Sequence, residues 1–504
     1  MPGKMRGMDI FMKRTGIIDI GSNSVRLIIV EIKSDKYFRI VYELKESIRL
    51  GKDMGADNSL DAGRMNRAVS TISAFKAICA SYSVQNILAV ATEAVRRASN
   101  QETFLKLVQD IAGVSVRVLS GKEEAYYDYM GAINSMDITD CLVMDIGGSS
   151  MEFILVENRE IQNSVSVPYG SISLTDLYLT NPVGFSDAFG RIIADVPWLH
   201  RATALPLIGI GGTFRNIGKI DRKRKEYPID NVHNYRLNND DISEILFLAI
   251  DLLSGRQKKI KGLSNDRSDI FIGPIAAINN IAALCGTKDI FISGSGVREG
   301  MLFEYVLNGG SRIGNVLDYS LENAMLNLDA EPRHSYQIFN LCNSLYNQLK
   351  SLFCSDQAAG KIIKTAALLH DSGIKINFYD HHKHTFYSIM NSRLSGLTHK
   401  ELLMAAYAAA LHRKDEFKID LQLYKCLIDP TDVLFIQQLG ILLKICEKLD
   451  LKQDGNIENI TCSVTESSVT MKLKTRQDAA METTGAMSCK NTFRRLFGRK
   501  LMIE

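Results

Sequence analysis

Residues 141–156 read CLVMDIGGSSMEFILV: an apolar run reaches Asp145, breaks at two glycines and two serines, and resumes as a second apolar run. Two such runs around a Gly-rich break are typical of a β-hairpin. Adjacent glycines can adopt positive φ and let a ligand approach the main chain. Successive amides in such a turn can form a nest for anionic oxygens. By itself, however, this pattern more often marks a hairpin without a ligand.

A second copy of the pattern lies near the N-terminus. Residues 15–31, TGIIDIGSNSVRLIIVE, again place Asp-Ile-Gly and small polar residues between two apolar runs. Two copies of one phosphate-cradling hairpin predict a duplicated domain whose two halves face one phosphate. Asp19 then occupies the position in the first copy that Asp145 occupies in the second.

Length and composition describe an ordinary globular protein of two to four domains, with 504 residues, 46% hydrophobic and 23% charged. The net charge of +3 is near neutral, so an anionic ligand must be met by local basic clusters. No window has 18 consecutive apolar residues and the first 13 residues lack an apolar core, so we expect neither a membrane span nor a signal peptide. Nine scattered cysteines favour reduced thiols in a cytoplasmic protein.

Two strand-to-helix junctions in the first half present candidate site residues. Residues 86–91 predict a buried strand that ends at Thr92, where a following helix N-terminus favours anions. Arg96, one turn into that helix, could reach the same anion or could be an ordinary surface arginine. Residues 114–119 predict the next strand, after which Glu123 and Glu124 open a helix. These glutamates could only complement the helix dipole, or one could project into the cleft as a general base.

The second half repeats this order of elements. Residues 205–210 form a predicted strand that runs into Gly211, Gly212 and Thr213, and residues 290–293 run into another Gly-rich turn and helix. Basic clusters lie at 219–225 and 256–261. Solvated loops are the default interpretation of such clusters, whereas a long anionic substrate would give them a role.

From about residue 317 onward the pattern changes to an α-rich module. Seven of the nine histidines lie after residue 333, and His370 and Asp371 are adjacent. Residues 458–474 alternate as a small hairpin near the C-terminus.

Together these stretches resemble the exopolyphosphatase/guanosine-pentaphosphate phosphatase family, in which they occur in the same order and spacing. The motifs are Asp19-Ile20-Gly21-Ser22-Asn23-Ser24, Ser120-Gly121-Lys122-Glu123-Glu124-Ala125, Asp145-Ile146-Gly147-Gly148-Ser149-Ser150-Met151-Glu152, Gly209-Ile210-Gly211-Gly212-Thr213 and Arg298-Glu299-Gly300. The resemblance implies an α/β chain with two ribonuclease H-like (actin-like) halves, 1–133 and 134–312, around an interdomain cleft. An α-rich, His-Asp-type domain with a small hairpin follows at 313–504.

The resemblance also implies roles for single positions. Glu124 would be the general base, while Asp145 and Glu152, together with Asp19, would hold Mg²⁺ (or Mn²⁺). The terminal phosphate would be bound by Ser22, Asn23, Ser24, Thr92, Arg96, Gly147, Gly148, Ser149, Ser150, Gly212 and Thr213.

Two positions depart from the family pattern, which most often has three glycines and a threonine. Here Ser149 replaces the third glycine and Met151 the threonine. If the turn needs positive φ, Ser149 costs about 1 kcal/mol. If the threonine hydroxyl contacts phosphate or metal, Met151 loses that contact. We therefore expect the double change to Gly and Thr to raise activity or tighten the dependence on Mg²⁺.

In the C-terminal module, the resemblance places a second metal at His334, His370, Asp371 and Glu447. Glu447 stands where aspartate is usual. The alternative is a helical dimerisation or substrate-channel domain with hydrogen-bonded histidines.

The expected function is hydrolysis of inorganic polyphosphate from its end, releasing orthophosphate. The alternative substrate is guanosine pentaphosphate, cleaved at its 5′ end to guanosine tetraphosphate. A rival of another class is a non-catalytic polyphosphate or nucleotide sensor, and a sugar kinase is disfavoured because no sugar-binding aspartate can be placed. We expect a cytoplasmic homodimer that binds neither nucleic acid nor membrane.

Overall fold

The computed structural model describes residues 13–34, 36–52, 54, 57–309, 312–354, 358–414 and 417–504. It divides into two compact units, Met1–Gly314 and Asn315–Glu504. The first 12 residues, which underlie the expectation that no signal peptide is present, lie outside the described ranges. Within those ranges, no helix has the length and apolar character needed to cross a bilayer.

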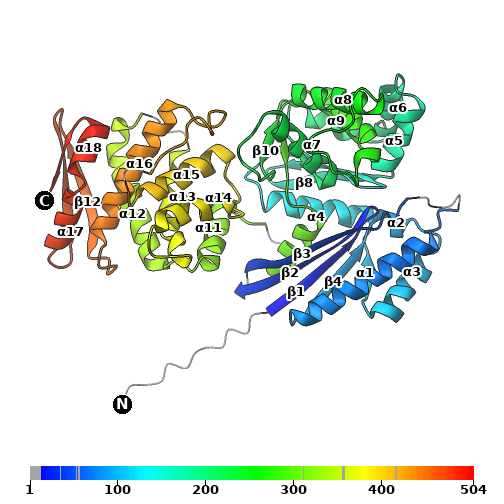
Figure 1. Ribbon diagram of the computed structural model, residues 1–504, viewed down its shortest axis with the longest axis horizontal. Coiled ribbons are helices and arrows are strands. Elements are labelled where there is room, and N and C mark those ends of the chain that lie inside the picture. Colours follow the sequence, from blue (N-terminus) through cyan, green and yellow to red (C-terminus); the bar gives the residue numbers. More distant parts are fainter. Residues whose placement is uncertain are drawn as a thin grey trace, which may run out of the picture. The chain divides into compact units, whose positions relative to one another are not determined.

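The first unit begins with a five-stranded sheet in the order β3-β2-β1-β4-β5 (Figure 1). Its strands are β1 (Lys13–Ile20), β2 (Ser24–Ser34), β3 (Tyr37–Ser47), β4 (Asn86–Ala91) and β5 (Val116–Val118). The antiparallel pair β1 and β2 is the predicted first hairpin, and β4 runs parallel to β1. Helices α1 (Ala62–Ser81) and α3 (Gln101–Leu107) supply apolar side chains to the core of this sheet.

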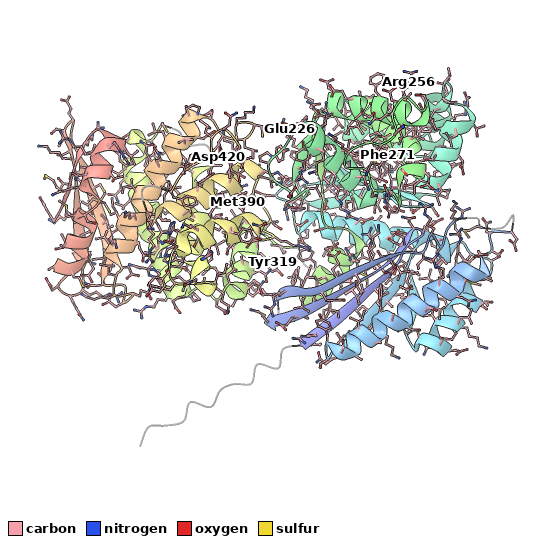
Figure 2. All side chains as sticks on the ribbon, viewed as in Figure 1. Glu226, Arg256, Phe271, Tyr319, Met390 and Asp420 are labelled. Atoms are coloured by element: carbon pink, nitrogen blue, oxygen red, sulfur yellow. The ribbon has the colours of Figure 1, made fainter. Side chains whose placement is uncertain are left out.

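The second sheet repeats this topology. Its order is β10-β11-β9-β6-β7-β8, and β6 and β7 form the antiparallel hairpin that carries Asp145. The strands are β6 (Cys141–Ile146), β7 (Met151–Glu157), β8 (Glu160–Val167), β9 (Leu207–Ile210), β10 (Tyr235–Leu237) and β11 (Ile290–Ile292). The helices are α5 (Ser171–Thr180), α6 (Phe185–Ile193), α7 (Gly211–Arg224), α8 (Asn239–Leu253) and α9 (Ile272–Leu284). Side chains of α9 and its flank, such as Phe271, fill this core (Figure 2). The predicted duplication is confirmed.

Each half ends in a helix that packs against the other half. Helix α4 (Gly121–Ile133), which follows β5, contacts β6, β7 and β8 of the second sheet. Helix α10 (Val297–Val306), which follows β11, contacts β1, and its Met301 and Leu302 pack with Ile17 and Ile28 in a second apolar cluster of the first sheet. Because α4 and α10 each pack against the other half, the ends of the two central hairpins lie together. In sequence, however, α10 belongs to residues 134–312.

The second unit is α-rich, as expected. Its helices are α11 (Val316–Asn327), α12 (Pro332–Leu349), α13 (Ala359–Leu369), α14 (His381–Asn391), α15 (His399–Leu411), α16 (Pro430–Leu449), α17 (Ala480–Met487) and α18 (Lys490–Phe497). The predicted hairpin is β12 (Ile457–Val464) with β13 (Ser468–Thr475), and a third strand, β14 (Lys500–Ile503), pairs parallel to β13. Four residues are too few to show a strand period, so β14 could not be predicted from the sequence.

Candidate active site

A cavity of about 100 Å³ lies between the two hairpin turns of the first unit. Both halves contribute to it, because β1, β4, β6 and β9 all end at its wall. The predicted residues that line it are Asp19, Ser22, Asn23, Ser24, Thr92, Glu124, Asp145, Gly147, Gly148, Ser150 and Gly212. Arg96, Ser149, Glu152 and Thr213 do not line it.

Glycines permit the two turns to approach each other. A Cβ atom on Gly148 would lie 2.7 Å from the Cβ of Ser22, so any side chain there would push the hairpins apart. Neither Gly147 nor Gly148 has positive φ, contrary to the expectation from sequence. Gly211 at the start of α7 does have positive φ, and a Cβ atom there would overlap Asp145 Oδ1. Close approach, more than unusual backbone angles, therefore explains the Gly-rich turns.

Ser149 and Met151, the two departures from the family pattern, do not have the structural effects expected from the sequence. Ser149 does not adopt positive φ, so its side chain imposes no backbone strain. Met151 is fully buried at the start of β7 and packs in the second core with Ile146 and Phe153. Strand alternation directs Met151 into this core while Glu152 faces the opposite side of the sheet. Neither residue impoverishes the cavity.

We therefore expect Ser149→Gly to leave kcat within about twofold of the parent. Met151→Thr should lower the free energy of unfolding by about 2–4 kcal/mol without raising activity, because it buries a hydroxyl and leaves a cavity. Urea unfolding and phosphate release check both changes, and Met151→Leu, which keeps the volume, is the matched control. Higher activity in either variant would restore the original expectation.

The two adjacent glutamates at the start of α4 have different tasks. Glu123 closes a capping box: its carboxylate accepts from the Ser120 amide at 2.8 Å, and its amide donates to Ser120 Oγ at 3.2 Å. Glu124 is the next residue of the helix and therefore points in another direction. It is buried and lines the cavity. Burial raises the pKa of Glu124 to about 8, with Asp145 and Asp19 adding and Arg96 opposing. A carboxyl with such a pKa is suited to proton transfer near neutral pH.

Arg96 holds Glu124 in place. Its Nη1 donates to Glu124 Oε2 at 3.1 Å and to the Leu119 carbonyl at 2.6 Å, and its Nη2 donates to Glu93. It is neither a plain surface arginine nor a cavity-lining residue. Helix α2 (Glu93–Arg96) has only four residues, and Arg96 at its end orients the carboxylate of Glu124.

Three carboxylates form a group at the cavity wall, of which Asp145 lines the cavity and the other two do not. Asp128, Asp145 and Glu152 bring one oxygen each within 4.8 Å of the others. Among the described residues, both carboxylate oxygens of Asp128 and Oδ1 of Asp145 are buried without a hydrogen-bond partner, whereas Glu152 accepts from Ser166 Oγ at 2.7 Å. Burial raises the pKa of all three carboxyls; Asp145 and Glu152 further raise the pKa of Asp128, and Asp145 further raises that of Glu152. Asp19, the third predicted metal ligand, lines the cavity outside this group.

Four arginines converge on the same cavity. Arg267 and Arg298 are buried, Arg26 and Arg215 are partly buried, and all four line the cavity. Burial lowers the pKa of Arg215 to about 9, with Arg26 and Arg298 adding to the effect. Arg298 Nη2 pairs with Glu43 at 3.0 Å, while its Nη1 has no hydrogen-bond partner in the part of the chain that the structure describes. Crowded arginines whose charges repel one another are electrostatically suited to an anion.

Thr213 and Asn23, two more of the predicted residues, lie next to these groups. Thr213 accepts from Arg267 Nη1 at 3.3 Å and so supports the arginine from behind. Asn23 presents a buried side-chain amide nitrogen without a partner. The two halves are joined beside the cavity by the Lys45–Asp266 and Arg49–Asp269 ion pairs, at 2.7 and 2.8 Å.

Comparison with known proteins agrees with this geometry. Residues 28–309 match the Ppx/GppA phosphatase family, and residues 316–486 match its domain III. The chain belongs to the Ppx/GppA phosphatase family. The resemblance inferred from the motifs is thereby confirmed.

Two curated relatives of this Ppx/GppA phosphatase match it over different lengths. A bifunctional 3-dehydroquinate synthase/phosphatase of Fusobacterium nucleatum is 28% identical over 58% of the chain, and the match spans 46% of that relative. A guanosine-5'-triphosphate,3'-diphosphate pyrophosphatase of Aeromonas hydrophila is 24% identical over 90% of the chain and 91% of its own length.

Solved structures confirm the actin-like fold of the first unit. An exopolyphosphatase from Cytophaga hutchinsonii superposes with a TM-score of 0.55 and 25% identity, over 59% of this chain and all of that one. The PPX-GPPA enzyme of Aquifex aeolicus gives a TM-score of 0.51 at 25% identity, over 58% of this chain and 99% of that one.

Several residues of the phosphatase's site, in the cavity lining or in the carboxylate group, give little signal in the sequence. Asp128 is one helical turn after Glu124, so the i, i+4 spacing of two acids on α4 was the available signal. Arg26 and Arg298 lie within the quoted stretches of sequence, but a single arginine there does not by itself indicate a ligand. Arg215 and Arg267 give no local signal, because a long loop and a helix bring them to the cavity.

Three of the basic side chains at 219–225 in the phosphatase form ion pairs. Arg224 and Lys225 both pair with Asp221 and Asp241, and Arg222 pairs with Asp230 at 2.6 Å. These ion pairs fix the end of α7, so residues 219–225 offer less cationic surface for a polymer than the sequence suggested.

The second unit brings its four predicted metal ligands together. Ligand atoms of His334, His370, Asp371 and Glu447 all lie within 4.8 Å of one another.

Proposed function

We propose that this phosphatase hydrolyses the terminal phosphoanhydride of inorganic polyphosphate and releases orthophosphate. The observation that supports this proposal best is the convergence of four arginines, two Gly-rich turns and a buried glutamate on one small cavity. The exopolyphosphatase of Cytophaga hutchinsonii shares the fold of this unit. Arginines and turn amides supply the electrostatic stabilisation that phosphoryl transfer needs.

Glu124 would act on the attacking water. It takes one proton from the water, the water oxygen bonds to the terminal phosphorus, and the P–O bond to the rest of the chain breaks. Arg96 keeps the Glu124 carboxylate oriented for this step. Arg26, Arg215 and Arg298 would meet the phosphoryl oxygens from the other side.

The three carboxylates fit a divalent cation. Unpartnered buried oxygens of Asp128 and Asp145, next to Glu152, form a donor set of hard oxygens, the ligands that Mg²⁺ and Mn²⁺ prefer. Phosphatases of this family are generally dependent on divalent metals. A cation here would offset negative charge on the transferring phosphoryl group. Asp128 thus replaces Asp19 in the proposed ligand set.

The pH dependence of kcat/KM provides a test of Glu124. Only the carboxylate form accepts a proton, so activity should rise with pH through the Glu124 pKa of about 8, above the usual range of a glutamate. Arg96 lowers the pKa of Glu124, so Arg96→Gln should move the rising limb to higher pH. Arg97→Gln, whose arginine pairs with Glu93 and not with Glu124, is the control. A limb near pH 4.5 in all three proteins would argue against Glu124 as the base.

Guanosine pentaphosphate is the second candidate substrate. It is favoured by the Aeromonas hydrophila relative, which matches over 90% of this chain and is named for that nucleotide. Phosphate release should be measured side by side from long-chain polyphosphate and from guanosine pentaphosphate, with Mg²⁺ and with Mn²⁺. Higher kcat/KM on polyphosphate supports the proposal, and higher kcat/KM on the nucleotide replaces it. No release from either would leave the sensor interpretation.

A further inference from the structure

A second cavity of the first unit shares no lining residue with the active-site cavity. Its volume is about 420 Å³, against about 100 Å³ for the active-site cavity. Helices α5 and α8, which both pack against α9, form part of its wall, and the connection from α8 to α9 completes it (Figure 1). We call it the α5–α8 cavity. A hollow of this size accommodates a small molecule.

The interior of the α5–α8 cavity is mostly aliphatic. Its floor consists of buried apolar side chains, namely Ala249, Ile260, Leu263, Phe271 and Ile272. Phe271 is only 3% exposed, so it offers little ring surface on which a nucleobase could stack. Leu179 and Leu253 also line the cavity but remain 48% and 50% exposed, which places them at its mouth. Single exposed leucines are common, whereas two at the mouth of an apolar cavity form a patch suited to an apolar ligand.

Two lysines give the α5–α8 cavity a cationic rim. Lys258 and Lys259 line it and are exposed. In the part of the chain that the structure describes, neither ammonium group contacts a carboxylate, whereas the neighbouring Arg256 forms an ion pair at 3.3 Å. Asp269 also lines the cavity, but Arg49 offsets its charge at 2.8 Å. The rim is therefore complementary to a ligand with an anionic group at one end.

The connection from α8 to α9 contributes side chains to both cavities. Asn265, Ser268 and Asp269 line the α5–α8 cavity. Arg267 lies between them in sequence and lines the active-site cavity. The backbone amide of Arg267 donates to the Ser264 carbonyl at 3.1 Å, so the connection is itself a compact turn. A ligand that contacts this connection in the α5–α8 cavity therefore restricts the backbone that carries Arg267.

We propose that the α5–α8 cavity binds a medium-chain carboxylate, such as a fatty acid anion, and that its occupancy activates the phosphate-releasing site through Arg267. The aliphatic chain occupies the apolar interior, and the carboxylate pairs with Lys258 and Lys259 at the exposed rim. Burial of apolar surface drives this binding, and the lysines determine which end of the ligand stays in water. Activation is the expected direction, because an arginine already held in place loses less freedom when the substrate binds. The regulatory part rests on the function proposed for the first unit, whereas the binding part does not.

Isothermal titration calorimetry of the full chain with decanoate tests the binding part. We expect one decanoate per chain and a negative heat-capacity change, which is the mark of apolar burial. Decanol has the same chain without the charge and should bind about tenfold more weakly, the effect expected of two solvent-exposed ion pairs. Lys258→Gln/Lys259→Gln should bind decanoate as weakly as decanol. Lys288→Gln, which changes an exposed lysine of the same half outside the cavity, is the control.

Leu253→Asp tests the apolar part of the cavity. Leu253 is half exposed, so this change should not unfold the protein, which circular dichroism checks, but it places a carboxylate at the mouth and should abolish decanoate binding. Phe247→Asp is the matched control, because Phe247 is an exposed residue of the same helix that does not line the cavity. Equal decanoate affinity in Leu253→Asp, the double lysine variant and the parent overturns the site. Binding of guanosine 5′-monophosphate in place of decanoate overturns the choice of ligand.

Steady-state kinetics test the regulatory part. Saturating decanoate should raise kcat/KM for phosphate release by the parent about fivefold, the lower end of the usual coupling between two sites. Leu253→Asp should not respond to decanoate, while Phe247→Asp should respond as the parent does. Decanoate binding without any change in kcat/KM supports the site and overturns its regulatory role. A parent that releases no phosphate with or without decanoate contradicts the function proposed for the first unit, and the calorimetric result is independent of it.

Discussion

Glu124→Gln should lower kcat for phosphate release by about 10²–10⁴-fold. Glu124 is buried in the cavity wall, receives a hydrogen bond from Arg96, and has a raised pKa because of its burial. Glutamine keeps the shape of the side chain and can still bond to Arg96, but it cannot accept a proton from water. The measurement is initial-rate kinetics on the preferred substrate, with KM determined separately.

Glu123→Gln is the matched control for this prediction, since it changes the same functional group one residue earlier. Glu123 closes the capping box of α4 and does not line the cavity. We expect activity near that of the parent and a loss of at most about 1 kcal/mol in the free energy of unfolding. If Glu124→Gln retained full activity, or both variants lost activity equally, Glu124 would not be the base.

Arg215→Gln should lower kcat by about 10²–10³-fold, the usual cost of removing one group that stabilises a developing oxyanion. Arg215 follows the turn at the start of α7 and lines the cavity with Arg26, Arg267 and Arg298. Because burial and the neighbouring arginines lower its pKa to about 9, its charge is unfavourable in the free protein. Removing it should therefore leave the free energy of unfolding equal or higher while activity falls.

Opposite changes in activity and stability separate a binding role for Arg215 from a structural one. Urea unfolding and steady-state kinetics on the same preparation give both quantities. Arg191→Gln, an exposed arginine on α6 of the same half, should change neither. A parallel loss of stability and activity in Arg215→Gln would show that the arginine supports the fold.

The duplicated hairpins were predictable because strand and turn signals are local. Alternation of apolar runs with Asp-Ile-Gly marks each β-hairpin within about 16 residues, and the repeat of the pattern predicts the repeat of the sheet. The acids at the ends of these strands, Asp19 and Asp145, accordingly lie together at the cavity. Local patterning likewise separated the α-rich second unit from the first.

The position of a side chain could not be predicted in this way where it depends on which face of a helix is buried or on a long connection between elements. Glu123 and Glu124 are equivalent in sequence, and only the packing of α4 against the second sheet turns Glu124 to the cavity. The sequence indicates that Met151 removes a threonine hydroxyl from the site, whereas strand alternation places Met151 in the core. His381 and His412 join His370 only because α14 and α15 pack together.

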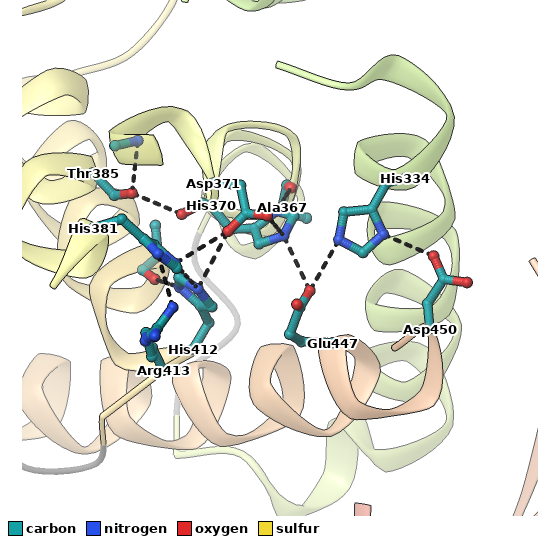
Figure 3. Close-up of polar contacts among 12 residues, drawn as sticks. His334, Ala367, His370, Asp371, His381, Thr385, His412, Arg413, Glu447 and Asp450 are labelled. Atoms are coloured by element: carbon teal, nitrogen blue, oxygen red, sulfur yellow. Dashed lines mark hydrogen bonds and ion pairs between the residues drawn. The ribbon is translucent and has the colours of Figure 1, made fainter. Parts of the chain in front are cut away.

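The sequence by itself therefore determined the family, the duplicated α/β architecture and the acids at the strand ends, because these follow from local apolar periodicity and turn chemistry. Only the tertiary structure decided which groups meet: Asp128 with Asp145 and Glu152, four arginines around one cavity, and four histidines and Glu447 around Asp371 (Figure 3). Contacts between distant segments depend on the burial of apolar faces elsewhere in the chain. The sequence around a charged residue therefore does not indicate which partner this burial will bring to it.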